Sequence, residues 1–201
     1  MLGAMSQVAA RRTSYPDYLA MEAGSLDKHE FCDGMVIAMA GGTLSHSLLK
    51  TNLTVAVGSA LRGRPCRPFD ADLRVRVPAT TLATYPDLTV ICGPPERDAE
   101  DHEAAVNPTA LFEVLSKSTA GYDRGEKFDH YQQLPSLQQY VLIDYTRPHV
   151  DVYTRLPSGG WERRGYGEDQ RVPLPSIDVE LSVAEIYSGW AEVRDEESAK
   201  A

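Results

Sequence analysis

The sequence contains few cysteines, and their spacing excludes two common uses of this residue. Its 201 residues include three cysteines, at positions 32, 66 and 92. Their number is odd, and none has the close neighbour that a zinc site or a redox pair requires. We therefore expect Cys32, Cys66 and Cys92 to be reduced and to pack as small apolar side chains, as is usual in a cytoplasmic protein.

The sequence also lacks long apolar runs. No stretch approaches the roughly 18 uninterrupted apolar residues of a membrane-spanning helix. The N-terminal sequence MLGAMSQVAARRTS has two arginines but no apolar core after them, unlike a signal peptide. We expect no membrane partner and a cytoplasmic location.

Basic residues are scarcer than acidic ones, with 20 lysines and arginines against 29 aspartates and glutamates and a net charge of −9. This balance argues against a generally basic nucleic-acid binder. Residues 96–103 and 192–200 together carry −6 of that charge, and we expect a solvated loop and a solvated tail there. The rest of the chain is only mildly acidic, so the charge disfavours DNA binding but is compatible with it.

The apolar content of the chain is sufficient for the core of one packed domain. Apolar residues make up 42% of the chain, and neither an internal repeat nor a linker divides it. Strand-like and helix-like segments are interspersed, which predicts a mixed α/β fold. We expect a single domain at residues 14–190, a disordered or loosely attached segment at 1–13, and an acidic tail at 191–201.

The expected elements follow from apolar periodicity, capping residues and turn residues. Helices are expected at residues 15–23, after Thr43 with a core-facing stripe of Leu49, Leu53, Val57 and Leu61, at 123–131 with Asp123 as cap, and from Ser182 to about Trp190. Strands are expected in a hairpin at 29–40 around Asp33-Gly34, at 69–77, 85–92 and 111–115, at 137–145, in a hairpin at 150–166, and at 177–181. In the segment 69–77 the charged side chains, Asp70, Asp72, Arg74 and Arg76, should form one polar face.

One stretch, NPTALFEVLSKSTAGYDRGEKFDHY at residues 107–131, places an acid in an apolar setting. Because strand side chains alternate, Glu113 shares a face with Leu111 and Leu115. An ionised carboxylate on such a face is costly unless it is paired or bound to a cation. The following helix presents Lys127, so a buried acid precedes a helix that carries a base.

A second carboxylate, Asp87, follows Pro86 at the start of the preceding strand. Carboxylates on neighbouring strands can bind one divalent cation, and Mg²⁺ prefers oxygen ligands. Lys127 could then orient or deprotonate an attacking water and stabilise phosphate charge. The alternative from spacing alone is that Pro86-Asp87 forms a turn and Glu113 pairs with an arginine.

Several segments resemble a restriction-endonuclease family that is abundant in cyanobacteria and belongs to the PD-(D/E)xK nuclease superfamily. They are YPDLTVIC, NPTALFEVLSKSTAGYDRGEKFDHYQQLPSLQQYVLID, FDADLRVRV, HEFCDGMVIAMAGGTLSHSLL and PSIDVELSVAEIY. The resemblance covers about residues 15–190 and implies a restriction-endonuclease-like fold, a mixed sheet with flanking helices and extra hairpins. It also implies Mg²⁺-dependent hydrolysis of DNA phosphodiester bonds, with Mn²⁺ as a substitute, by a homodimer.

The resemblance assigns the central roles residue by residue. Asp87 matches the motif aspartate and Glu113 the (D/E) position, so these two would bind the metal. Leu115 occupies the position of the motif lysine. We take Lys127 as the relocated catalytic lysine, because Lys117, although nearer in sequence, falls in the turn.

Supporting roles also follow from the resemblance. Glu30 and Asp72 fall where this family places further acids near the site. His46 matches a family histidine, with a site role and a buried structural role about equally supported. Ser116 would cap the turn or steady Glu113 and a phosphate, because no His/Asp partner accompanies it as a nucleophile. Met35 stands where the family's hairpin usually carries a glutamate after Asp-Gly.

Two other functions fit the same residues. A nuclease-fold protein that no longer cleaves could serve as a binding or interaction module, which the acidic charge and the absent in-place lysine favour. The carboxylate pair could also serve a hydrolase of small phosphorylated substrates.

Overall fold

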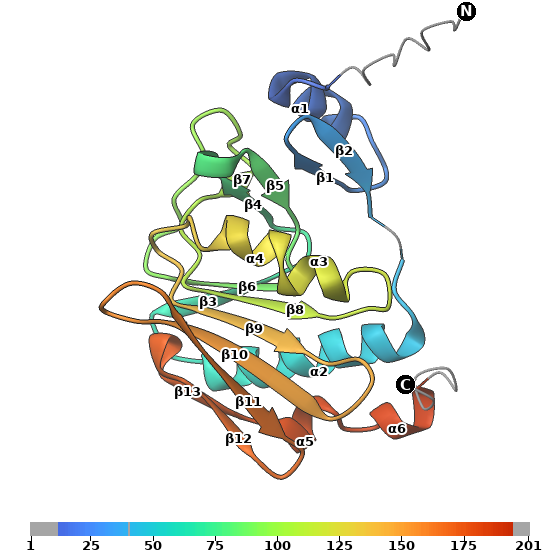
Figure 1. Ribbon diagram of the computed structural model, residues 1–201, viewed down its shortest axis with the longest axis vertical. Coiled ribbons are helices and arrows are strands. Elements are labelled where there is room, and N and C mark those ends of the chain that lie inside the picture. The colour runs from blue at the N-terminus through green and yellow to red at the C-terminus, as the bar shows by residue number, and fades with distance from the viewer. Residues whose placement is uncertain (1–11, 40, 195–201) are drawn as a thin grey trace, which may run out of the picture.

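The computed structural model describes residues 12–39 and 41–194 and shows a mixed α/β fold, with helices on both faces of a central sheet (Figure 1). The described strands form a six-stranded sheet, a five-stranded sheet and a two-stranded sheet. Each of the two larger sheets combines antiparallel pairs with one parallel pair. The predicted mixed α/β class is therefore confirmed.

The strands are short, and consecutive strands often lie in different sheets. In spatial order, the six-stranded sheet contains β11 (Trp161–Gly167), β10 (His149–Arg155), β9 (Gln139–Ile143), β8 (Ala110–Val114), β6 (Leu88–Cys92) and β3 (Cys66–Asp70). The five-stranded sheet contains β2 (Met35–Ala38), β1 (His29–Cys32), β5 (Leu82–Thr84), β4 (Arg74–Val77) and β7 (Ala104–Ala105). The third sheet pairs β12 (Arg171–Leu174) with β13 (Val179–Ser182).

One long helix and several short ones flank these sheets. They are α1 (Tyr15–Ala23), α2 (Leu44–Ala60), α3 (Ala120–Arg124), α4 (Glu126–Tyr131), α5 (Val183–Ile186) and α6 (Trp190–Val193). Thr43 caps α2 as predicted, because its side chain accepts a hydrogen bond from the backbone N–H of His46. Within residues 12–39 and 41–194, no helix combines the length and the apolar character that crossing a membrane requires.

The central strand β8 separates two apolar cores, because its side chains alternate between the faces of the sheet. Ala110, Phe112 and Val114 face the core that contains the predicted α2 stripe of Leu49, Leu53, Val57 and Leu61, together with β13 and α5. Leu111 and Leu115 face the other core, which α4 covers with Phe128 and Tyr131 (Figure 1). Glu113 lies on this second face, beneath α4.

The single strand predicted at residues 69–77 is wrong. A turn at residues 71–73 splits it, so β3 joins the six-stranded sheet and β4 the five-stranded sheet. Asp70 stabilises this turn, because its side chain accepts a hydrogen bond from the N–H of Asp72 at 3.0 Å. The alternating apolar residues of the predicted strand therefore lie in two different sheets.

The arginines of β4 and the aspartates of the acidic segment 96–103 are buried, whereas the glutamates of that segment are exposed, as predicted for a solvated loop. Arg74 is buried and forms two hydrogen bonds with the buried carboxylate of Asp101, at 2.5 and 2.8 Å. Arg76 is also buried, and it donates to the carbonyl oxygen of Leu82 at 3.1 Å. The acidic loop is thus fastened to the five-stranded sheet.

The prediction of three reduced cysteines is also wrong. Cys66 and Cys92 lie opposite each other in the β3–β6 register and form a disulfide, whereas Cys32 is a buried thiol. Because the two cysteines are 26 residues apart, the sequence alone did not indicate that they pair.

The chain termini and the last helix differ in part from the prediction. Ser182 caps α5, but that helix ends at Ile186, and Trp190 begins the separate α6, which extends into the predicted tail. The N–H of Thr13 donates to the carbonyl oxygen of Gly34, so the end of the predicted loose segment is attached to the β1–β2 hairpin. Residues 1–11 and 195–201 lie outside the described residues.

The two-core arrangement predicts unequal effects of two substitutions on α2. Leu53 is fully buried, so Leu53→Ala should lower the free energy of unfolding by about 2–5 kcal/mol. Val55 lies on the same helix but is 62% exposed, so Val55→Ala should change it by less than about 0.5 kcal/mol. Urea denaturation of both variants measures the difference, and equal losses would contradict the assigned orientation of α2.

Candidate active site

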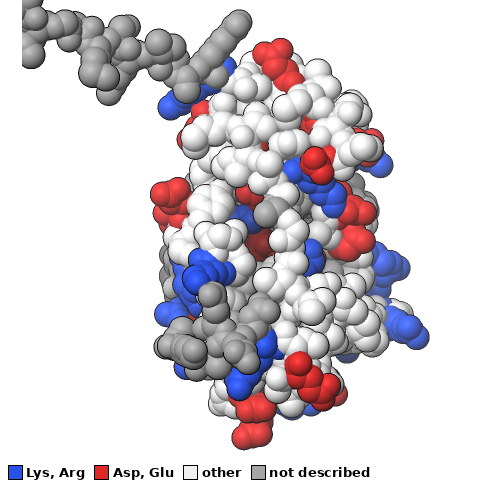
Figure 2. Space-filling view, turned by 90° about the vertical axis from the view of Figure 1, so that its right-hand side faces the viewer, with Lys and Arg blue, Asp and Glu red and all other residues white. Residues whose placement is uncertain are grey.

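A pocket of about 910 Å³ opens between the N-terminal part of α2, β2, and the turn that joins β8 to α3. Figure 2 looks onto this side of the molecule, and a hollow near the middle shows acidic and basic atoms at its bottom. Most of the visible rim is uncharged. The charged groups of the site are therefore recessed.

Glu113 on β8 and Lys127 on α4 form the central ion pair of the pocket, with 2.9 Å between Oε1 and Nζ. Both side chains are only 6% exposed. The hydroxyl of Tyr131, one helical turn after Lys127, donates to the same Oε1 at 2.9 Å. Tyr131 is part of the apolar core that α4 covers, and it also holds the carboxylate of Glu113 in place.

The helix that carries Lys127 does not begin as predicted. The backbone breaks at Gly125, so Asp123 ends up inside the preceding helix α3 instead of capping α4. The Asp123 carboxylate is buried and lies 3.7 Å from the ammonium of Lys127. The expected cap thus contributes another charge to the pocket.

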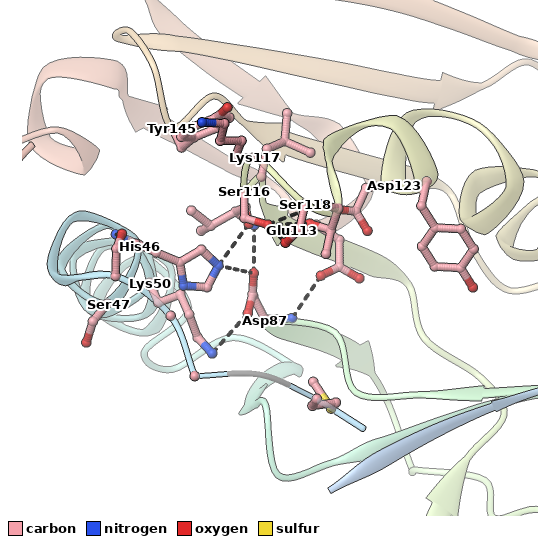
Figure 3. A pocket seen from close by; sticks show the side chains of 18 of the residues that line it. His46, Ser47, Lys50, Asp87, Glu113, Ser116, Lys117, Ser118, Asp123 and Tyr145 are labelled. Atoms are coloured by element: carbon pink, nitrogen blue, oxygen red, sulfur yellow. Dashed lines mark hydrogen bonds and ion pairs between the residues drawn. The ribbon is translucent and has the colours of Figure 1, made fainter. Parts of the chain in front are cut away.

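Asp87 lies at the entrance to β6, between α2 and β8 (Figure 3). Its Oδ2 accepts a hydrogen bond from the N–H of Val114 at 2.8 Å, and its Oδ1 pairs with the ammonium of Lys50 at 2.9 Å. The N–H of Asp87 donates to Oε2 of Glu113 at 3.4 Å. Asp87 and Glu113, the two predicted metal ligands, are thus neighbours in the pocket.

His46 is fixed where α2 approaches β8. Its Nε2 lies 3.0 Å from the carbonyl oxygen of Val114 and 3.6 Å from Oδ2 of Asp87. On the other side of the ring, a Cβ added to Gly42 would lie only 2.6 Å from Nδ1. The small residue before the helix therefore allows the chain to pack closely against His46.

The remaining predicted site residues divide into those inside and those outside the pocket. Glu30 is inside, with Oε1 at 3.1 Å from the Lys127 ammonium and a hydrogen bond from Thr84. Ser116 lines the pocket and accepts a hydrogen bond from the N–H of Thr119, as expected of a turn residue. Asp72 is outside, in the β3–β4 turn, where its 79% exposed side chain pairs with Lys28.

Sequence reasoning did not identify Lys50, and it set Lys117 aside because that residue falls in the turn. Lys50 lines the pocket, and the signal available in the sequence was its spacing of four residues from His46 on one helix. Lys117 is exposed on the turn after β8, but it also lines the pocket. The position of the motif lysine, Leu115, is 1% exposed and belongs to the apolar core beneath α4.

Burial and neighbouring charges act differently on the two candidate metal ligands. Burial raises the pKa of Glu113 to about 8, an effect that the ammonium of Lys127 opposes without cancelling. Burial also acts to raise the pKa of Asp87, but the contacts with His46 and Lys50 outweigh it and hold that pKa below its usual value. Asp87 is therefore the acid that is already ionised at neutral pH.

Lys127 lies among more negative than positive charge. Burial acts to lower the pKa of Lys127, but three carboxylates within 4 Å, those of Glu30, Glu113 and Asp123, raise it well above its usual value. The three acids outnumber the one ammonium, and a divalent cation that displaced their protons would meet an excess of negative charge.

The donor atoms of the pocket fit Mg²⁺ better than a softer metal. Among the described residues, no group of three or more His, Cys, Asp or Glu side chains has the arrangement of a metal centre. Mg²⁺ does not require one, because it keeps several waters and is usually bound through one or two carboxylates. Asp87 and Glu113 provide such a pair.

Comparisons with known proteins show the family of this chain. Residues 15–184 match the model of the family described as "Uma2: Putative restriction endonuclease". The chain belongs to this family. The family resemblance inferred from the sequence segments is thereby confirmed.

Two relatives and one solved structure extend the Uma2 match. "Uncharacterized protein slr1290" of Synechocystis sp. is 36% identical over 180 residues, which cover 90% of this chain and 94% of the relative. "Uncharacterized protein sll1609" of the same organism is 33% identical over 145 residues, covering 72% and 82%. A crystal structure titled as a putative nuclease belonging to DUF820, from Anabaena variabilis, superposes with a TM-score of 0.71 at 21% identity and covers 87% of this chain and 97% of that one. This likeness shows that the fold is shared.

The raised pKa of Glu113 predicts a pH dependence of stability in metal-free buffer. Between about pH 5 and pH 8 the unfolded chain has released this proton while the folded protein retains it, so the free energy of unfolding should fall as the pH rises. Glu113→Gln should flatten that decline, whereas Glu96→Gln, on the exposed loop, should leave it unchanged. Urea denaturation at several pH values tests this, and equal slopes in all three proteins would contradict the assignment.

Proposed function

We propose that this Uma2-family protein is a Mg²⁺-dependent endonuclease that hydrolyses phosphodiester bonds of DNA. The observation that carries the proposal is that Asp87, Glu113 and Lys127 meet in one pocket although they come from the segment just before β6, from β8 and from α4. A lysine thus reaches the acid pair from a neighbouring helix, which compensates for the leucine at position 115.

Asp87 and Glu113 would hold the metal, with Mn²⁺ as a substitute. Bound there, the ion supplies Lewis-acid chemistry, lowering the pKa of a coordinated water and offsetting charge on the phosphate. The hydrogen bond from Tyr131 and the ion pair with Lys127 orient the carboxylate of Glu113 before the metal arrives. Preorganised ligands of this kind reduce the reorganisation that binding requires.

Lys127 acts as a fixed positive charge rather than as a base. Its raised pKa keeps the ammonium protonated, and its side chain is 6% exposed at the bottom of the pocket. A phosphate placed beside Glu113 would lie within reach of this ammonium, which would stabilise charge that develops on the phosphoryl oxygens. The attacking water therefore requires another proton acceptor, such as solvent or the substrate phosphate.

The net charge of −9 does not oppose this proposal. Three lysines line the pocket, and two of them, Lys50 and Lys127, contact the acid pair. Contacts that serve one phosphate do not need the extended basic surface that tight binding of a long duplex requires. Cleavage of both strands would be served by two copies of the chain, and the homodimer stays a prediction.

Substitution of the three central residues should separate catalysis from folding. Asp87→Asn and Glu113→Gln should remove Mg²⁺-dependent cleavage of supercoiled plasmid and of oligonucleotides, and Lys127→Met should slow it by about 10²-fold or more. Asp72→Asn is the matched control, because Asp72 is an acid that lies outside the pocket and should not affect the rate.

The measurement is the initial rate at saturating Mg²⁺, with thermal unfolding of each variant to verify the fold. EDTA should stop the reaction, and added Mg²⁺ or Mn²⁺ should restore it. Full activity of folded Asp87→Asn and Glu113→Gln variants would contradict the proposed site. Absence of both Mg²⁺ binding and cleavage in the wild-type protein would favour the non-cleaving binding module.

A further inference from the structure

The pocket contains a second lysine whose position differs from that of Lys127. Lys50 approaches the acid pair from α2 and contacts Asp87 (Figure 3), whereas Lys127 approaches from α4 and contacts Glu113. The two ammonium groups therefore flank the two acids from opposite sides. A phosphate bound at the acids would lie between two positive charges.

The two lysines also differ in their freedom to move. Lys127 is 6% exposed and lies within 4 Å of three carboxylates. The side chain of Lys50 is 30% exposed, and among the described residues its ammonium has one ion-pair partner, Oδ1 of Asp87. A long, partly exposed lysine with a single partner can change position at little cost.

The surroundings of Asp87 indicate which of its contacts can break when a metal binds. Oδ2 of Asp87 is held by the N–H of Val114, and the nearby ring of His46 is confined between Gly42 and the carbonyl oxygen of Val114. These contacts are made by backbone or by closely packed groups. Of the contacts of Asp87 with Val114, His46 and Lys50, the ion pair between its Oδ1 and Lys50 is the one that a flexible side chain makes at the open pocket.

We infer that Lys50 is a further catalytic residue, which neutralises Asp87 in the metal-free protein and, when the metal binds, releases Asp87 and contacts the scissile phosphate. This inference rests on the proposed function. Lys50 occupies one oxygen of a predicted metal ligand, so its ammonium and a divalent cation compete for that oxygen. Once released, the same ammonium still lines the pocket and is available to a phosphate oxygen.

The inference predicts opposite effects of one substitution on metal binding and on catalysis. Lys50→Met should bind Mg²⁺ roughly two- to fivefold more tightly, because the competing ion pair is removed. The same variant should cleave DNA at least about tenfold more slowly, because a charge on the phosphate is lost. A residue that merely supported the structure of the site would weaken both properties together.

The experiment combines isothermal titration with MgCl₂, without DNA, and initial rates of oligonucleotide cleavage at saturating Mg²⁺. Lys50→Arg keeps the charge and should retain the wild-type Mg²⁺ affinity within about twofold and a larger share of the rate. Lys28→Met is the control, because Lys28 pairs with Asp72 on the surface and should alter neither quantity. Circular dichroism verifies that each variant is folded.

The outcomes separate this inference from the function on which it rests. Tighter Mg²⁺ binding together with slower cleavage in Lys50→Met supports the inference. Weaker Mg²⁺ binding, or an unchanged cleavage rate, overturns it while the proposed nuclease activity stands. Failure of the wild-type protein itself to bind Mg²⁺ and to cleave overturns both.

Discussion

The buried ion pair between Glu113 and Lys127 determines how the rest of the pocket is arranged. Glu113 projects from β8 onto a face that otherwise carries Leu111 and Leu115, so it requires a partner from the element that covers this face. That element is α4, which Phe128 anchors by stacking on Tyr140 at 5.3 Å between ring centroids. The packing of α4 therefore brings Lys127 to the acid.

Such a cluster is difficult to explain by stability alone. Removing several charges from water costs free energy that their mutual attraction recovers only in part, and apolar replacements are often at least as stable. Here three carboxylates surround one buried ammonium, and a fourth, Asp87, adjoins them. Titratable groups whose pKa values are shifted, gathered at the bottom of a pocket, mark it as the candidate functional site.

The sequence was sufficient for much of this arrangement because the relevant signals were local. The alternation around Glu113, the spacing of the α2 stripe and the Asp33-Gly34 turn each depend on neighbouring residues, and the structure has all three. Lys127 was a candidate because of the helix expected after the strand and the family resemblance, and the structure places its ammonium 2.9 Å from Oε1 of Glu113. The fold class followed from the same local patterns together with the family resemblance.

The errors arose where contacts distant in sequence decide the structure. The strand at 69–77 alternates perfectly, yet the burial of Arg74 against Asp101, 27 residues away, assigns its second half to another sheet. The Cys66–Cys92 pairing likewise depends on the register of two strands. Asp123 had the spacing of a cap for the helix that carries Lys127. The backbone break at Gly125 instead places Asp123 in α3, with its carboxyl group 3.7 Å from the ammonium of Lys127. Lys50 was missed because nothing local shows that α2 lies beside Asp87.

The proposed activity depends on the binding of one divalent cation by Asp87 and Glu113 for phosphodiester hydrolysis. The most direct measurement is anomalous diffraction from crystals of the wild-type protein soaked in MnCl₂, compared with crystals of Glu113→Gln. We expect an anomalous peak between the two carboxylates in the wild-type protein, and its loss or strong weakening in the variant. A peak that persists unchanged without the Glu113 carboxylate, or Mn²⁺ bound only outside this pocket, would contradict it.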